Sequence, residues 1–249
     1  MARATVKATP AEPDRGEGRV LALSGDWSPD LQKARVYEQI LLDIILGELA
    51  PNSRLDERAL VRRYAAGLAG VRDALGRLAL EGLVIRRARA GTTVSALDLV
   101  ELGHALEVRR LLEPHCAALA AVHASDDDIA EIVAAFDGAE RAAGAKDSRA
   151  LIGMDQRFHA ALAKASRNAT LARILIPLQH KAARYWAFTM GADTEEDRLA
   201  EVQRHRVLAQ RIACRDEEGA RLEAMRILKM IPETIRRAVM AESAVAMAR

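Results

Sequence analysis

The sequence predicts a mainly α-helical protein in which an N-terminal winged helix-turn-helix is followed by an all-α antiparallel helical bundle. Two observations lead to this fold class. Residues 54–94 show two short helical stripes followed by a basic β-hairpin pattern. From Asp98 onward the chain is rich in alanine, leucine, glutamate and arginine and poor in glycine, which favours helix. We therefore expect a flexible extension at 1–30, a winged helix at 31–95 and a helical domain at 97–243.

The elements of the first half follow from local patterns. Residues 1–30 contain scattered proline, glycine and charge without a sustained hydrophobic period, as flexible segments do. An amphipathic helix is expected at 33–48, because apolar residues recur there at helical spacing. The apolar positions of the next two helices are Leu55, Leu60 and Tyr64, then Val71, Leu75 and Leu78. Gly82 is expected to end the second of these helices, and residues 83–94 give two β-prone runs around a turn.

These elements carry short motifs that resemble the GntR family of bacterial transcription regulators. The motifs are GELAP at 47–51, LDERAL at 55–60, VRDAL at 71–75 and EGLV at 81–84. The resemblance covers residues 36–94 at matching spacing, and such a multi-part match is more specific than one short motif. It implies a DNA-binding regulator that acts as a homodimer on a palindromic operator in double-stranded DNA.

Arginine side chains are the expected contacts to the DNA phosphates. The candidates are Arg58, Arg62, Arg72, Arg86, Arg87 and Arg89. Charge runs on helices are usually solvated faces, but the helix-turn-helix and wing favour DNA contact for Arg58, Arg72 and the wing arginines. For Arg62 and Arg63 the two interpretations stay open.

The start of the second helix of the helix-turn-helix departs from the family pattern. Where the family usually has a Ser-Arg-Thr-Pro run, this chain has Gly67, Leu68, Ala69 and Gly70. The capping hydroxyls, one arginine and the proline of the first turn are therefore missing. This departure leaves open a second function, a sensor or interaction module whose DNA specificity is degraded.

Composition limits the other possibilities. The 249 residues leave room for two domains, and 50% hydrophobic residues supply their cores. A net charge of +2 means that a DNA-binding surface must arise from local clustering of basic residues. The sequence shows neither a signal peptide nor an apolar run of the roughly 20 residues that span a bilayer, so we expect a cytoplasmic protein without a membrane partner. Cys116 and Cys214 are expected to be buried free thiols.

Helix start and stop signals divide the second half into six expected helices. Their spans are 97–123, 126–143, 147–166, 168–190, 194–214 and 217–242. Pro177 and Pro232 fall inside two of them and are expected to kink or split them. Such a set of helices makes an antiparallel bundle, whose central cavity is a common location for a small ligand.

Asp155 and His159 are the side chains with the clearest chemistry in this half. They are four residues apart, so on a helix both project from one face and can converge on a metal ion. An isolated aspartate and histidine at this spacing more often form a surface contact between neighbouring turns of a helix. A later helix carries a further histidine, His205.

The surrounding residues resemble the FCD domain, the ligand-binding half of the FadR-type branch of GntR regulators. The resemblance rests on the run from Asp155 to Leu171 and on EVRRLLEP at 107–114. It implies a divalent metal held by an aspartate and three histidines, and by position Asp155, His159 and His205 take three of those places. The fourth place falls near Ile227, and no histidine follows His205. The remaining set suits zinc, nickel or manganese. The alternative is a polar cavity in which both histidines bind a ligand directly.

The same resemblance implies that Arg109 points into the cavity and binds a small carboxylate effector. The alternative for Arg109 is a salt bridge with Glu113 one turn away. A metalloenzyme that uses the Asp/His/His set is a third possible function. We expect no enzyme, because the sequence shows no accompanying nucleophile, pair of general bases or phosphate-binding loop.

Overall fold

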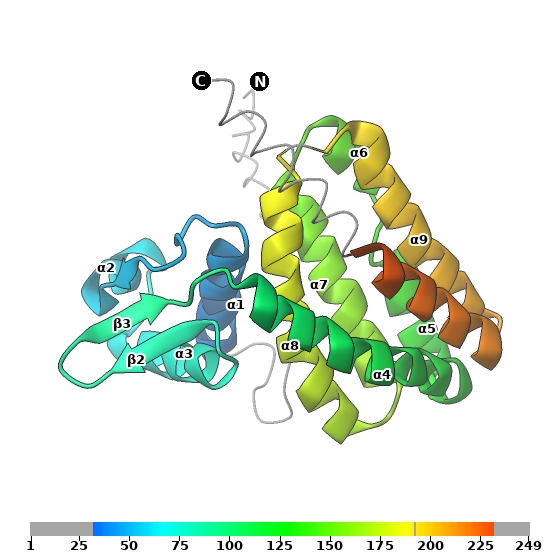
Figure 1. The fold of residues 1–249 in the computed structure, drawn as a ribbon, viewed down its shortest axis with the longest axis horizontal. Coiled ribbons are helices and arrows are strands. Elements are labelled where there is room, and N and C mark those ends of the chain that lie inside the picture. The colour runs from blue at the N-terminus through cyan, green and yellow to red at the C-terminus, as the bar shows by residue number, and fades with distance from the viewer. Residues whose placement is uncertain (1–31, 192, 232–249) are drawn as a thin grey trace, which may run out of the picture.

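The computed structural model describes residues 32–191 and 193–231. The expected extension at 1–30, Pro232 and the end of the last expected helix lie outside the described residues. Figure 1 shows two halves side by side, a small half with all of the described strands and a larger half built of helices. The expected fold class, a mainly α protein with a winged helix before a helical bundle, is confirmed.

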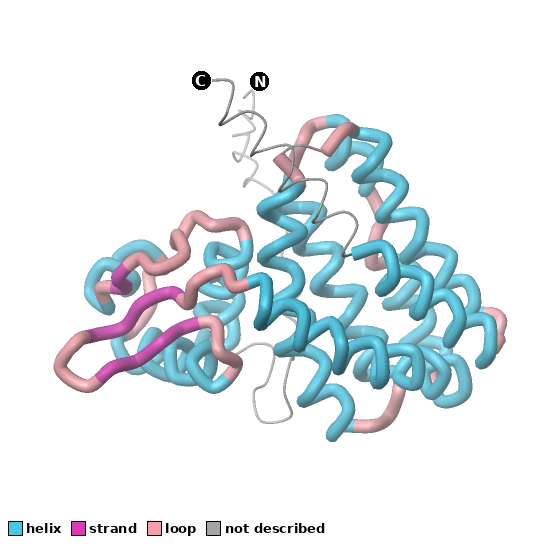
Figure 2. The backbone as a smooth tube through the Cα atoms, in the orientation of Figure 1, coloured by secondary structure: helices cyan, strands magenta, loops and turns pink. Residues whose placement is uncertain are grey.

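The smaller half has the element order of a winged helix. Its elements are α1 Gln32–Ile45, β1 Arg54–Leu55, α2 Glu57–Arg63, α3 Leu68–Leu80, β2 Val84–Arg87 and β3 Gly91–Val94. The three strands form an antiparallel sheet in the order β1-β3-β2, with Ile85 opposite Thr93. Figure 2 shows the β2–β3 hairpin reaching away from the helical half as a wing.

Local sequence accounts for these elements. Asp56 caps α2, because its side chain accepts a hydrogen bond from the Ala59 amide at 2.7 Å. Gly82 ends the turn after α3 with a φ of +78°, a conformation that glycine adopts without strain. Leu75 and Leu78 are fully buried and pack α3 against the shared core.

The larger half consists of the remaining helices. These are α4 Leu99–His123, α5 Asp126–Ala134, α6 Ala139–Gly144, α7 Ser148–Ala165, α8 Ala169–Thr189, α9 Glu195–Ala213 and a further helix at 217–231. The single helix expected at 126–143 is wrong, because the chain breaks into α5 and α6. Gly138 causes the break: it has a φ of +83°, a left-handed conformation that no α-helix continues through.

Two further expectations about this half can be compared with the structure. Of the kink or split expected at Pro177, the split is wrong, because α8 runs unbroken from Ala169 to Thr189. The proline removes one backbone hydrogen bond, but Leu175 and Gln179 on either side of it are buried, and their packing holds the helix together. Cys214 is exposed, because it is the C-terminal capping residue of α9, where the chain turns outward. Cys116 is buried as expected, and burial raises the pKa of its thiol to about 12.

The two halves pack through α1, which lies against α7 and α8 (Figure 1). Asp43 on α1 is buried at this contact and accepts hydrogen bonds from Arg63 at 2.5 Å, Tyr64 at 2.7 Å and Arg149 at 2.5 Å. Arg149 belongs to α7, so it joins the helical half to the winged helix. Among the described residues, no helix is both long and apolar enough to cross a membrane.

Candidate functional site

A cavity lies inside the helical half, lined by side chains from α4, α7, α8, α9 and the helix at 217–231. Its polar lining residues are Arg109, Asp155, His159, Gln179, Thr189, Glu201 and His205. The apolar part of the wall includes Trp186, Ile227 and Ile231. A mixed wall of this kind, with few polar groups among apolar ones, is typical of a small-molecule site.

The structure brings Asp155, His159 and His205 together at this cavity, and all three are buried. Asp155 Oδ1 lies 3.5 Å from His159 Nε2 and 3.8 Å from His205 Nε2. One candidate ligand atom from each residue lies within 4.8 Å of the others. The one-turn spacing on α7 sets the first two residues on one face, and α9 supplies the third.

Hydrogen bonds fix which atoms face the centre of this cluster. Asp155 Oδ2 accepts hydrogen bonds from Gln156 Nε2 at 3.0 Å and Gln179 Nε2 at 2.9 Å, which leaves Oδ1 toward the histidines. His205 Nδ1 lies 3.0 Å from the Glu201 carbonyl oxygen. A carbonyl oxygen only accepts, so His205 Nδ1 donates this hydrogen bond, and Nε2 is the nitrogen that faces Asp155.

Each ring nitrogen of His159 faces a carboxylate: Nε2 faces Asp155 and Nδ1 faces Glu113. Its Nδ1 lies 3.8 Å from Glu113 Oε1, and Glu113 in turn pairs with Arg109. Burial alone would raise the pKa of the Asp155 carboxyl, but His159, His205 and Arg109 hold it below its usual value. Burial would likewise raise the pKa of Glu113, and Arg109 and His159 outweigh that effect. Both carboxyls are therefore ionised at neutral pH.

Arg109 combines features of both expectations. It lines the cavity, and it also forms the salt bridge with Glu113. Its Nε donates to Glu113 Oε2 at 2.7 Å and its Nη2 to Oε1 at 3.1 Å. These bonds use the single hydrogen of Nε and one of the two hydrogens on Nη2, so a bound carboxylate would meet Nη1 and the second Nη2 hydrogen, or would have to displace Glu113.

The donor set suits a divalent transition metal. Two imidazole nitrogens and one carboxylate oxygen converge, and each is held by a further hydrogen bond or charge contact. Ile227, at the place where the resemblance expects a fourth ligand, is 3% exposed and lines the same cavity. Isoleucine offers no donor atom. A metal ion held by the other three residues would therefore have its fourth coordination position open to water or to a ligand.

The six candidate DNA-contacting arginines are all on the surface of the winged helix. Arg58 and Arg62 are exposed on α2, Arg86 and Arg87 on β2, and Arg89 in the turn between the wing strands. Arg72 is exposed on α3, where its Nε pairs with Glu57 Oε2 at 2.8 Å.

Arg63 differs from these six arginines. Its Nη2 is committed to Asp43 at 2.5 Å and Glu48 at 2.8 Å. Arg63 therefore takes part in ion pairs within the winged helix, while 44% of its side chain stays exposed.

The start of α3 shows the consequence of its diverged sequence. Gly67 is the capping residue and provides no side-chain hydrogen bond to the helix. Leu68 follows it with 40% of its surface exposed. The helix thus begins with an apolar and uncapped turn on the surface.

Sequence reasoning missed Gln156, Gln179 and Glu201 as members of the site. Gln156 is next to Asp155, but neighbouring residues on a helix point in different directions and are rarely partners. Gln179 comes from another helix, and its contact with Asp155 follows only from the packing of α7 on α8. No sequence spacing indicates that contact.

Comparison with protein families gives two matches that cover most of the chain. Residues 32–94 match the family described as bacterial regulatory proteins, gntR family. Residues 104–230 match the FCD domain. The boundary between the two matches falls at the end of the wing.

Curated relatives and solved structures agree with these matches. The HTH-type transcriptional regulator LutR of Bacillus subtilis is 30% identical over 168 residues, which are 57% of this chain and 75% of that protein. The HTH-type transcriptional repressor GlaR of Escherichia coli is 28% identical, over 60% of this chain and 70% of that protein. The structure of E. coli McbR/YncC superposes with a TM-score of 0.71 at 20% identity, covering 83% of this chain and 98% of that one. A GntR regulator from Rhodococcus sp. RHA1 gives a TM-score of 0.61 at 19% identity, covering 84% and 98%.

Proposed function

The chain belongs to the GntR family of bacterial regulatory proteins, with a C-terminal FCD domain, and we propose that it is a homodimeric regulator that binds a palindromic operator and responds to a small carboxylate through a divalent metal. We assign DNA binding to residues 31–95, and effector binding and dimerisation to residues 97–243. The named relatives LutR and GlaR are transcription regulators, which supports regulation rather than catalysis. Operator binding would place the protein in the cytoplasm.

The observation that carries the effector part is the convergence of Asp155, His159 and His205 on one point of the cavity. Three buried donor atoms within 4.8 Å of one another are arranged as a metal site requires. With two imidazoles and one carboxylate as ligands, zinc, nickel or manganese would keep open positions. A bound ion would supply the positive charge to which an effector carboxylate binds.

The charge of the cavity supports a metal as well. Asp155 and Glu201 are carboxylates in its wall, and Arg109, the cation among the described lining residues, is already paired with Glu113. A small anion entering this cavity alone would meet an excess of negative charge. A divalent cation reverses that balance, so we expect the effector to bind after the metal.

For the DNA part, the supporting features are the winged helix and its exposed arginines. Arg58, Arg62 and Arg72 on the helices and Arg86, Arg87 and Arg89 on the wing would contact phosphates. The apolar start of α3, with Gly67 and Leu68, supports a second candidate function, a sensor or interaction module with degraded DNA specificity. A metalloenzyme is less well supported, because the relatives are regulators.

A DNA titration distinguishes the two candidates. The purified protein is titrated against DNA from upstream of its own gene and against scrambled DNA, at several salt concentrations. A specific regulator binds the first DNA roughly a thousandfold more tightly than the second. Equal, weak and steeply salt-dependent binding to both DNAs, and to other candidate operators, would contradict the operator proposal and favour the sensor.

A further inference from the structure

We propose that Gln179 and His180, neighbouring residues on α8, couple the Asp155–His159–His205 site to the end of helix α3. Through this coupling, binding of a metal or ligand in the cavity would affect α3, the second helix of the helix-turn-helix. This inference rests on the proposed function, because it takes the Asp155–His159–His205 cluster as the metal site.

Gln179 is the contact on the cavity side. It is 7% exposed, lines the cavity and donates from Nε2 to Asp155 Oδ2 at 2.9 Å. The orientation of its amide is fixed, because a flipped amide would place Oε1 against an ionised carboxylate. A shift of the Asp155 carboxylate toward a bound ion would therefore pull on Gln179.

His180 is the contact on the DNA-binding side. It is 1% exposed, and its Nδ1 lies 3.1 Å from Glu81 Oε2. Glu81 is the C-terminal capping residue of α3, and its side chain also accepts a hydrogen bond from Tyr37 at 2.8 Å and from Arg77 at 3.0 Å. The Glu81 carboxylate thus joins α1, α3 and α8 in a buried position.

The geometry of α8 allows one movement to reach both contacts. Consecutive residues on an α-helix point about 100° apart, so Gln179 faces the cavity while His180 faces the winged helix. A small rotation or bend of α8 would move both side chains together. Pro177 stands two residues before Gln179 and removes one backbone hydrogen bond of α8, which weakens the helix against bending at this place.

A second contact of α8 strengthens the connection. Arg184 is one turn beyond His180 and donates to the Ser95 carbonyl oxygen at 2.7 Å and to Ser95 Oγ at 2.8 Å. Ser95 follows directly after β3, in the segment that leads into α4. Helix α8 therefore contacts both the C-terminal end of α3 and the segment that follows β3 of the wing.

The test measures hydrogen exchange of the backbone amides at 77–83 with and without Ni²⁺, and Ni²⁺ affinity by calorimetry. In the wild-type chain we expect Ni²⁺ to change these exchange rates roughly fivefold or more, the low end of allosteric coupling. His180→Leu should bind Ni²⁺ as tightly as wild type and lose the change at 77–83. Glu81→Gln, which lies outside the cavity, is the second variant if His180→Leu fails to fold.

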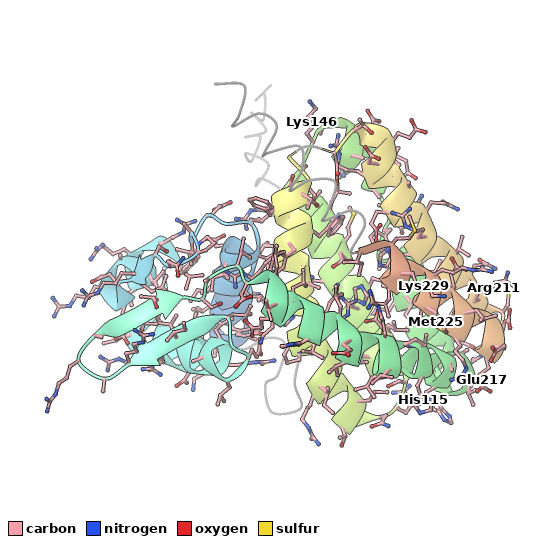
Figure 3. All side chains as sticks on the ribbon, viewed as in Figure 1. His115, Lys146, Arg211, Glu217, Met225 and Lys229 are labelled. Carbon is pink, nitrogen blue, oxygen red and sulfur yellow. The ribbon has the colours of Figure 1, made fainter. Side chains whose placement is uncertain are left out.

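His115→Gln is the matched control, because His115 is exposed on the outer surface of α4 (Figure 3). It should respond to Ni²⁺ as wild type does. Ni²⁺ binding without a change at 77–83 in the wild-type chain, or an unchanged response in both His180→Leu and Glu81→Gln, would overturn the coupling alone. No Ni²⁺ binding by the wild-type chain would overturn the proposed metal site and this inference with it.

Discussion

Arg109 and Glu113 form a bidentate ion pair one turn apart on α4, with side chains only 2% and 5% exposed. Arg109 lines the cavity, and Glu113 Oε1 lies 3.8 Å from His159 Nδ1. A buried pair of this kind costs desolvation free energy that its mutual attraction offsets. We therefore infer that the pair adds little net stability and mainly holds one cation and one anion in place beside the site.

Breaking the Arg109–Glu113 pair should destabilise the fold more than removing it. Glu113→Gln leaves a buried guanidinium without its counter-ion and should lower the free energy of unfolding by about 3 kcal/mol or more. The double variant Arg109→Met with Glu113→Leu should recover most of that loss. Urea unfolding of the single and double variants measures the difference. A double variant that is less stable than Glu113→Gln would show that the pair stabilises the fold strongly.

Alanine substitution at Asp155, His159 or His205 should abolish metal binding, because two remaining donors do not form a site. Calorimetry with Zn²⁺ should give one site for each wild-type chain and none for each variant. His104→Ala is the control, since His104 is exposed on α4 and should leave the titration unchanged. Equal Zn²⁺ binding by wild type and all three variants would place the metal elsewhere.

Ile227→His should tighten metal binding. Ile227 lines the cavity near the three donors, so a histidine there would add a fourth ligand. We expect an affinity for Zn²⁺ at least about tenfold higher, which corresponds to about 1.4 kcal/mol. Ile227→Leu controls for the change in packing. If the histidine variant melts as wild type does but binds Zn²⁺ no better, position 227 does not face the ion.

Acid should weaken the contact between the two halves through Asp43. Burial would raise the pKa of this carboxyl, but hydrogen bonds from Arg149, Tyr64 and Arg63 hold it below its usual value. A carboxyl whose pKa is lowered by folding adds stability above its unfolded pKa of about 3.9, and this stability is lost as the pH falls through the folded pKa.

The Asp43→Asn variant isolates that contribution. It should lose about 2 kcal/mol of unfolding free energy at pH 7, because charge-assisted hydrogen bonds are lost. The difference from wild type should shrink as the pH falls below about 4. Urea unfolding at pH 7 and pH 3 tests this, with Glu107→Gln on the exposed face of α4 as control. A difference that is constant with pH would mean that Asp43 acts through packing alone.

Restoring polar residues at the start of α3 should strengthen DNA binding. A Cβ at Gly67 would meet nothing within 4 Å, so Gly67→Ser fits and should add a few tenths of a kcal/mol through capping. Leu68→Arg adds a cation at an exposed position. The double variant should bind upstream DNA more tightly than Gly67→Ser alone. Unchanged affinity for every tested operator would indicate that this end of α3 does not reach the groove.

The sequence predicted the elements and their order well, because hydrophobic spacing and capping residues act locally. The one-turn spacing of Asp155 and His159 was enough to place both on one face of α7. Their partnership with His205 came only from the resemblance to a known domain, since periodicity does not say which helices are neighbours. The break at Gly138 was missed because a single glycine within an alanine-rich run is compatible with helix until its φ is known.

Contacts between residues far apart in the sequence were beyond sequence reasoning. Arg62 and Arg63 have the same sequence pattern and are both exposed, yet it is Arg63 that pairs with Asp43. The contacts Gln179–Asp155 and His180–Glu81 join residues 24 and 99 positions apart. Both contacts follow from the position of α8, which packs against α7 and α1, and no local pattern encodes them.

The two cysteines differ in a way that is useful to the experimenter. Cys116 is buried with its thiol pKa raised to about 12, whereas Cys214 is exposed at the end of α9. A maleimide spin label should therefore react at one position of the natural sequence without any engineered cysteine. Each copy of the chain would carry one label, so a dipolar distance measurement between labels would show directly whether two copies associate and how far apart their α9 helices lie.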